Sequence, residues 1–226
     1  MAGSITLEGI EIDVVRKKGR RSMALSINAK TGRPTLSIPY LCPLLIAKAF
    51  AAKHLVWLKA NIKAHPAKQT FAPDMQISLL GQPLCLKQTT LKQGAFIQNG
   101  TLYISGHIEH FHRRTKDFIK VELLKYITHQ AQIYAEHTGQ TIKHVTVRDT
   151  FSRWGSCSGT GHLSFSWRLA LAPKDVLDYV IAHEVAHLTQ MNHSPQFWQV
   201  VRKLYPEAAK AKNWLKQNGG KLHSFL

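Results

Sequence analysis

The sequence predicts an α+β protein, with a β-rich unit in residues 1–110 that holds one helix and a second domain in residues 111–226. Two observations carry this prediction. Apolar and polar residues alternate through much of the first hundred residues, which is the period of a half-buried strand. From His112 onward apolar residues recur every three or four positions, which is the period of an amphipathic helix. At 226 residues with 44% hydrophobic residues, the chain can bury a core without disulfides or metals as staples.

The elements of the first part follow from alternation and from proline. Residues 5–38 alternate as strands, and Pro43 opens a single helix that extends to about His65. The polar, proline-bearing connector "HPAKQTFAPD" (65–74) marks an internal boundary. Further short strands are predicted within 75–88 and 94–106.

The second part alternates helices with strands. A long helix is predicted from His112 to about Glu136, with Gly139 beyond its end, followed by strands at 143–149 and 161–169 that "TFSRWGSCSGT" connects. Pro173 starts a helix that runs through "HEVAH" (183–187), and Ser194 and Pro195 begin the next one. A last helix is expected over about 207–218, ending at Gly219 and Gly220.

The composition indicates a soluble protein with a positive field. The formal net charge is +17, with 14 Lys and Arg against 5 Asp and Glu in residues 1–110 and 16 against 8 in residues 111–226. Such a surface favours anionic partners, including nucleotides and non-specific contact with nucleic acid. Three widely spaced cysteines without a CxxC pair, no signal peptide and no membrane-spanning run predict a cytoplasmic location without membrane association.

The segment "HEVAHLTQMNHSPQFW" (183–198) carries the chemistry. In a helix His183 and His187 project from one face, within reach of a single metal ion, and imidazole is the usual neutral ligand of zinc. Glu184 follows the first ligand, where its carboxylate can act as general base toward a metal-activated water molecule.

A third ligand must come from further along the chain. His193 stands six residues past His187, immediately before the next helix, whereas Glu207 stands twenty residues past it. We favour His193, because Glu207 belongs to an outlying segment with a solvated face. Gln190 occupies the place midway between His187 and His193 where metzincins have a glycine, so we expect a different helix end, with Asn192 in the left-handed conformation.

Several ordered motifs resemble a known family. "SRWGSCS", "GHLSFSWRLALAP", "VLDYVIAHEVAHL", "MNHSPQFW" and "WLKQNG" together look like the YgjP-like or SprT-like zinc-dependent hydrolases, a branch of the zincin metallopeptidases. The resemblance covers residues 148–219 closely and the β-rich part only loosely. It implies a zincin-like core in which the HExxH helix lies beside a small sheet. It also implies one zinc ion per chain, bound by His183, His187 and His193, with Glu184 as base.

The sequence thus predicts a metal-dependent hydrolase of metallopeptidase type, with residues 111–226 as its catalytic domain and a protein or peptide substrate. Two alternatives stay open, both motivated by the positive charge: a metal-dependent nucleoside triphosphate pyrophosphohydrolase, and a DNA-associated protease or nucleic-acid-binding module. Arg153, His162 and Tyr179 are candidates for stabilising an oxyanion. Cys157 is interpreted as a small core residue rather than a nucleophile.

Overall fold

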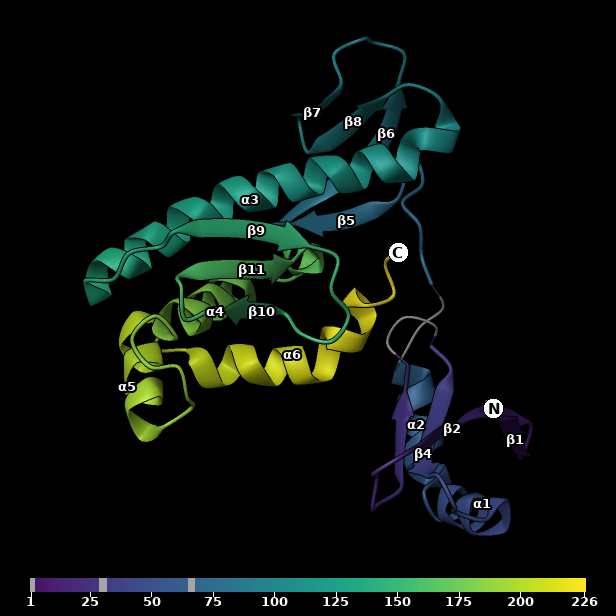
Figure 1. Cartoon of the computed structure of the whole chain (residues 1–226). Helices are drawn as coiled ribbons and strands as arrows, with labels where there is room; N and C mark the ends of the chain where they lie inside the picture. The colour runs from purple at the N-terminus through teal and green to yellow at the C-terminus, as the bar shows by residue number, and fades with distance from the viewer. Residues whose placement is uncertain (1–2, 29–31, 65–67) are drawn as a thin grey trace. The chain divides into compact units, whose positions relative to one another are not determined.

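The computed structural model describes residues 3–28, 32–64 and 68–226, and these divide into two compact units. The first comprises residues up to Lys68, and the second extends from Gln69 to Phe225. The chain is a mixed α+β protein, as the sequence predicts (Figure 1). No helix of the described residues is long and apolar enough to cross a membrane.

The first unit is a four-stranded sheet with two helices. Its strands are β1 (Gly3–Leu7), β2 (Ile10–Lys17), β3 (Ala24–Ile27) and β4 (Pro34–Pro39), in the order β1-β2-β4-β3 with β2 and β4 parallel. Alternation places Ile12, Val14, Leu36 and Ile38 on the buried face, where they pack against helix residues such as Leu58.

Two helices replace the single one predicted between Pro43 and His65: α1 (Leu44–Lys53) and α2 (Leu55–Ala64). His54 separates them with φ −104° and ψ 16°, and its Nδ1 lies 2.9 Å from the Phe50 carbonyl oxygen. The ring nitrogen thus occupies a carbonyl that a continuous helix would use for its backbone ladder. His65 lies outside the described residues.

The second unit begins with another four-stranded sheet. Its strands are β5 (Gln76–Leu79), β6 (Gln82–Thr89), β7 (Ala95–Gln98) and β8 (Thr101–Ser105), in the order β5-β6-β8-β7 with β6 and β8 parallel. This is the topology of the first sheet, so the chain builds the same arrangement twice. A 3-10 turn, η1 (Ile108–His110), then leads into α3 (Phe111–Thr138), which ends at Gly139 in the left-handed conformation.

The remaining elements are β9 (His144–Arg148), β10 (Gly155–Cys157), β11 (His162–Ser166), η2 (Trp167–Leu171), α4 (Lys174–Ala186), α5 (Pro195–Leu204) and α6 (Ala208–Leu222). Of these, β9, η2 and α4 pack on α3, and β10, α5 and α6 pack on α4 (Figure 1). The three strands form a sheet in the order β10-β11-β9, with β9 parallel and β10 antiparallel to β11. Its inner face packs on α3 and α4.

The predicted division at residue 110 falls inside the second unit. The sheet β5–β8 contributes Leu84, Leu86, Leu102 and Ile104 to the same apolar core as α3 and α4. The packing boundary therefore precedes Gln69, close to the proline-bearing connector. The catalytic domain is a functional assignment and not a packing unit, and residues 111–226 remain our prediction for it.

Three local expectations in this unit are wrong. Trp167 and Leu169 lie in a 3-10 helix instead of a strand, and both are fully buried. The segment 150–160 is not a plain connector, because it contains β10. The last helix continues past Gly219, where a Cβ would lie 3.0 Å from the Trp154 ring; here glycine permits close packing instead of ending a helix.

Candidate metal centre

The three predicted histidines meet at the end of α4 and the start of α5. His183 lies in the last turn of α4, His187 is its C-cap residue with helical backbone angles, and His193 lies just before the Ser194 N-cap of α5. One ligand atom from each ring can be chosen so that all lie within 4.8 Å of one another. Glu207 does not belong to this group; it lies exposed at the N-cap of α6.

The path from His187 to His193 is a tight turn. Gln190 donates its backbone N–H to Ala186 at 3.0 Å, and its carbonyl oxygen lies 3.0 Å from His187 Nδ1. Asn192 is not among the described residues with positive φ, so the predicted left-handed Asn192 is wrong. The chain turns through hydrogen bonds, and the Gln190 carbonyl orients the His187 ring.

The start of α5 fixes the third histidine. Ser194 Oγ accepts a hydrogen bond from the Phe197 backbone N–H at 3.3 Å, and Pro195 occupies the first turn, both as the sequence predicts. Phe197 is fully buried, and its ring centroid lies 4.9, 4.4 and 4.8 Å from those of His183, His187 and His193. This ring therefore supports all three imidazoles, a role that the sequence reading missed.

The rings fit a bound metal ion. His183 Nε2 and His193 Nε2 lie 3.2 Å apart. This is close to the roughly 3.3 Å that separates two nitrogens bound to one tetrahedral zinc at about 2.0–2.1 Å. The contact between His187 Nδ1 and the Gln190 carbonyl requires the proton on Nδ1, which leaves Nε2 with its lone pair. His183 Nδ1 is buried without a hydrogen-bond partner in the part of the chain described.

Burial favours the neutral, metal-binding form of His183 and His187. Burial, followed by the charges of His187, His193 and Lys212, lowers the pKa of His183 to about 4. Burial also lowers the pKa of His187, although the Gln190 hydrogen bond opposes this. Protons therefore compete weakly with a metal ion at these two rings near neutral pH.

Glu184 lies in a tight, mostly apolar site. Its side chain is 6% exposed, and burial raises its pKa to about 7, while the charge of Arg153 lowers it. The residue packs against the backbone of Gly155 in β10, where a Cβ would lie 2.5 Å from Glu184 Oε1. The glycine in "RWGSC" thus makes room for this carboxylate.

Replacing Gly155 with Ala is expected to destabilise the fold by about 1–3 kcal/mol, because the added methyl overlaps the buried carboxylate. The melting temperature should fall by roughly 2–4 °C for each kcal/mol. Gly159→Ala is the matched control, since a Cβ there meets nothing within 4 Å. Thermal unfolding measures both variants, and equal melting temperatures would contradict the close packing.

The other predicted residues divide by location. Tyr179 is buried; its ring lies edge-on to the His183 ring with centroids 6.0 Å apart and is tilted relative to the Tyr205 ring at 6.4 Å. Burial raises the pKa of Tyr179. His162 is exposed on β11. Arg153 is exposed, and its positive charge lowers the pKa of Glu184, the proposed base. Burial raises the pKa of Cys157 to about 11, which keeps it a thiol and agrees with its interpretation as a packing residue.

Trp154 packs on helix α6 and on the residue that caps it, His223. Its ring stacks on His223 with centroids 4.3 Å apart and contacts the helix α6 at Gly219. This packing fixes the chain immediately before Gly155.

Comparison with known proteins identifies the family. The model of the YgjP-like metallopeptidase domain matches residues 21–218. A search of curated proteins finds no significant match. Solved structures with similarity include the metallopeptidase zymogens of Pyrococcus abyssi abylysin and Methanocaldococcus jannaschii jannalysin. The abylysin structure is 22% identical in sequence, and the match covers 40% of this chain and 92% of abylysin. The jannalysin structure is 17% identical, and the match covers 40% of this chain and 94% of jannalysin. Both matches have a TM-score of 0.36. Because the family model matches most of the 226 residues, this chain belongs to the YgjP-like metallopeptidase family.

Proposed function

We propose that this protein is a zinc-dependent peptidase in which His183, His187 and His193 hold the metal and Glu184 is the general base. The observation that carries the proposal is the convergence of the three imidazoles beside the buried Glu184 carboxylate. Membership of a metallopeptidase family supports a peptide substrate. These four residues belong to α4 and the segment that leads to α5, and this arrangement supports a zincin-like core.

The protein's part in metal binding is to present three oriented rings, two of which have a lowered pKa. A zinc ion with three histidine ligands and an open position lowers the pKa of water and polarises a carbonyl group. The Gln190 carbonyl fixes the tautomer of His187, and the buried Phe197 ring limits the movement of all three imidazoles. A preformed ligand set of this kind reduces the ordering cost of binding.

Glu184 would move the proton. Its raised pKa, caused by burial, makes the carboxylate a better proton acceptor than an exposed glutamate. The protonated side chain can then return the proton to the leaving amine. Arg153 supplies the nearby positive charge that favours the carboxylate form before the reaction.

The edge strand β10 offers a place for the substrate backbone. It pairs only with β11, so its other side is not used by the three-stranded sheet. An extended peptide can add to such an edge through backbone hydrogen bonds. Because Gly155 of β10 contacts Glu184, a peptide in this position would bring its backbone near the proposed base.

Metal removal and restoration test the function. The protein stripped with a chelator should cleave neither unfolded casein nor a mixed peptide library, and one equivalent of zinc should restore cleavage. Nucleoside triphosphates are assayed in parallel for phosphate and pyrophosphate release. Zinc-dependent release from nucleotides without any peptide cleavage would replace the peptidase proposal by a phosphoanhydride hydrolase.

A further inference from the structure

A basic groove lies on the outer face of the sheet β10-β11-β9, which is the face turned away from α3 and α4. The groove has a volume of about 530 Å³. Its lining holds two arginines, two histidines and six hydroxyl side chains, but no carboxylate. The positive and titratable members are His144, Arg148, Arg153 and His162. We refer to these four residues and the cavity they line as the basic groove.

Strand register explains why these side chains gather on one face. His162 is opposite His144, Ser164 is opposite Thr146, and the next pair places Arg148 at the end of β9. The intervening residues point inward and pack in the core. Of the twelve lining residues only Cys157 and Leu163 lack a polar or basic side chain, so the groove is mostly polar.

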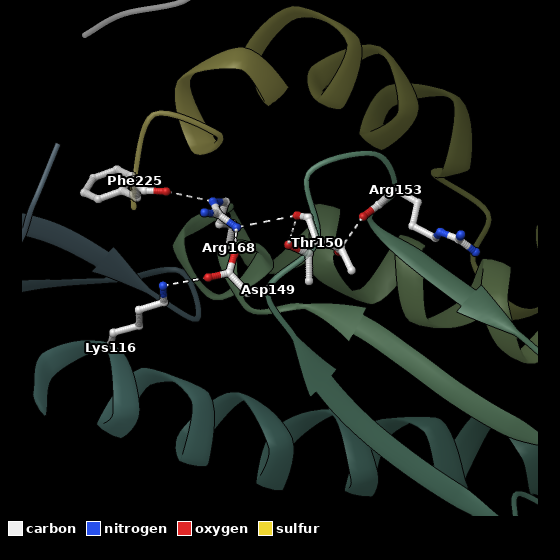
Figure 2. Close-up of polar contacts among 7 residues, drawn as sticks. Lys116, Asp149, Thr150, Arg153, Arg168 and Phe225 are labelled. Carbon is white, nitrogen blue, oxygen red and sulfur yellow. Dashed lines mark hydrogen bonds and ion pairs between the residues drawn. The ribbon is translucent and has the colours of Figure 1, made fainter. Parts of the chain in front are cut away.

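The groove itself contains no carboxylate, although the charge of Arg153 also acts on Glu184. Neither Arg148 nor Arg153 forms an ion pair within the described chain. Asp149, between them in sequence, has both oxygens engaged: Lys116 Nζ donates at 2.7 Å and the Arg168 guanidinium at 2.6 Å (Figure 2). Although burial raises the pKa of Asp149, these two hydrogen bonds outweigh it and hold the pKa at about 2. The Asp149 carboxylate thus pairs with Lys116 and Arg168 and does not line the groove.

The same network holds Arg153 in place. Arg168, fully buried, also donates to the Phe225 carbonyl at 2.9 Å, which ties it to the end of the chain. Thr150 Oγ1 donates to the Arg153 carbonyl at 2.9 Å. Figure 2 shows the Arg153 side chain extending away from this network. The loop backbone is therefore fixed while the guanidinium is left available to a ligand.

The groove begins beside the proposed reaction centre. Strand β10 places Gly155 against Glu184 on its inner side and contributes Ser156 to the groove on its outer side. A peptide added to the edge of β10 would direct alternate side chains toward the outer face of the sheet.

We propose that the basic groove is a recognition subsite for acidic side chains of the peptide substrate, so that peptides with alternate glutamates bind best. This inference rests on the proposed function, because it assumes a peptide along β10. The spread of the charges favours separated carboxylates over one compact phosphate group: Arg153 lies just before β10, beside the added peptide, whereas Arg148 lies on β9, on the far side of β11.

Binding to an inactive, zinc-loaded Glu184→Gln protein tests the subsite without requiring turnover. Two fluorescein-labelled extended peptides are compared by anisotropy, one with glutamate at alternate positions and one with glutamine there. The glutamate peptide should bind about 10-fold more tightly, as expected for roughly 1.4 kcal/mol of charge-assisted contact. Adding Arg148→Gln and Arg153→Gln together should remove most of this difference and leave the affinity for the glutamine peptide unchanged. Arg113→Gln, an exposed arginine on α3, is the matched control and should keep the difference.

The outcomes separate the subsite from the proposed function. Equal affinities for the two peptides, or an effect of the double arginine variant that weakens both equally, would overturn the subsite even if peptides are cleaved. Preference for the glutamate peptide that depends on the two arginines supports the subsite, whatever the active protein does in the cleavage assay. If neither peptide binds and a nucleoside triphosphate does so through these arginines, the groove serves phosphate and the peptide subsite is excluded.

Discussion

Replacing Glu184 with Gln is expected to lower kcat by about 10²- to 10⁴-fold while the protein keeps its zinc. The amide has nearly the same shape as the carboxylate and fits the space that Gly155 leaves, but it cannot accept the proton. The three imidazoles are unchanged, so the metal content should stay at one ion per chain. Initial rates on a peptide substrate and elemental analysis of the same sample measure both quantities.

Glu136→Gln is the control for this substitution, since Glu136 lies exposed near the end of α3. It should retain the full rate. A Glu184→Gln protein that turns over peptides at the wild-type rate would remove Glu184 from the reaction. A protein that loses both zinc and activity would instead indicate that Glu184 helps to hold the metal.

Replacing His193 with Ala is expected to weaken zinc binding by about 100-fold or more, because the loss of a direct ligand should exceed the 10- to 100-fold effects seen for outer-shell residues. His193 is exposed, so the metal-free variant should melt near the wild-type temperature. Competition with a chromophoric zinc chelator gives the affinity, and thermal unfolding without metal gives the stability.

Glu207→Gln provides the comparison, because Glu207 is the alternative third ligand considered from sequence spacing. It lies exposed at the start of α6, so its substitution should leave zinc affinity unchanged. If zinc affinity falls in Glu207→Gln and persists in His193→Ala, the ligand assignment is wrong and the α6 segment must move toward α4.

Errors in the predicted elements come from residues whose local signal was overridden by packing. Gly219 is a helix terminator in isolation, yet α6 continues through it because the Trp154 ring needs the space of its missing side chain. Trp167 and Leu169 continue the alternation of β11 but are buried in a 3-10 helix. Alternation reports only that a residue is buried, and several backbone conformations can bury it.

The sequence also did not predict that the two four-stranded sheets share one topology. In both sheets the two central strands are parallel, β2 with β4 and β6 with β8, and each outer strand is antiparallel to its central neighbour. Strand pairing depends on alternation and register, which unrelated residues can satisfy equally well. Similar topology therefore does not require similar sequence.

The sequence by itself determined the metal-binding residues as candidates, because the helical period brings His183 and His187 to one face and Ser194 with Pro195 starts a helix beside His193. Those relations are local, and local geometry can be read from spacing. The tertiary structure alone decided the environment of Glu184, the support of the three rings by Phe197, and the gathering of Arg148 and Arg153 in one groove. Each of these depends on contacts between strands, loops and helices distant in sequence, where burial and charge are set by neighbours that spacing does not reveal.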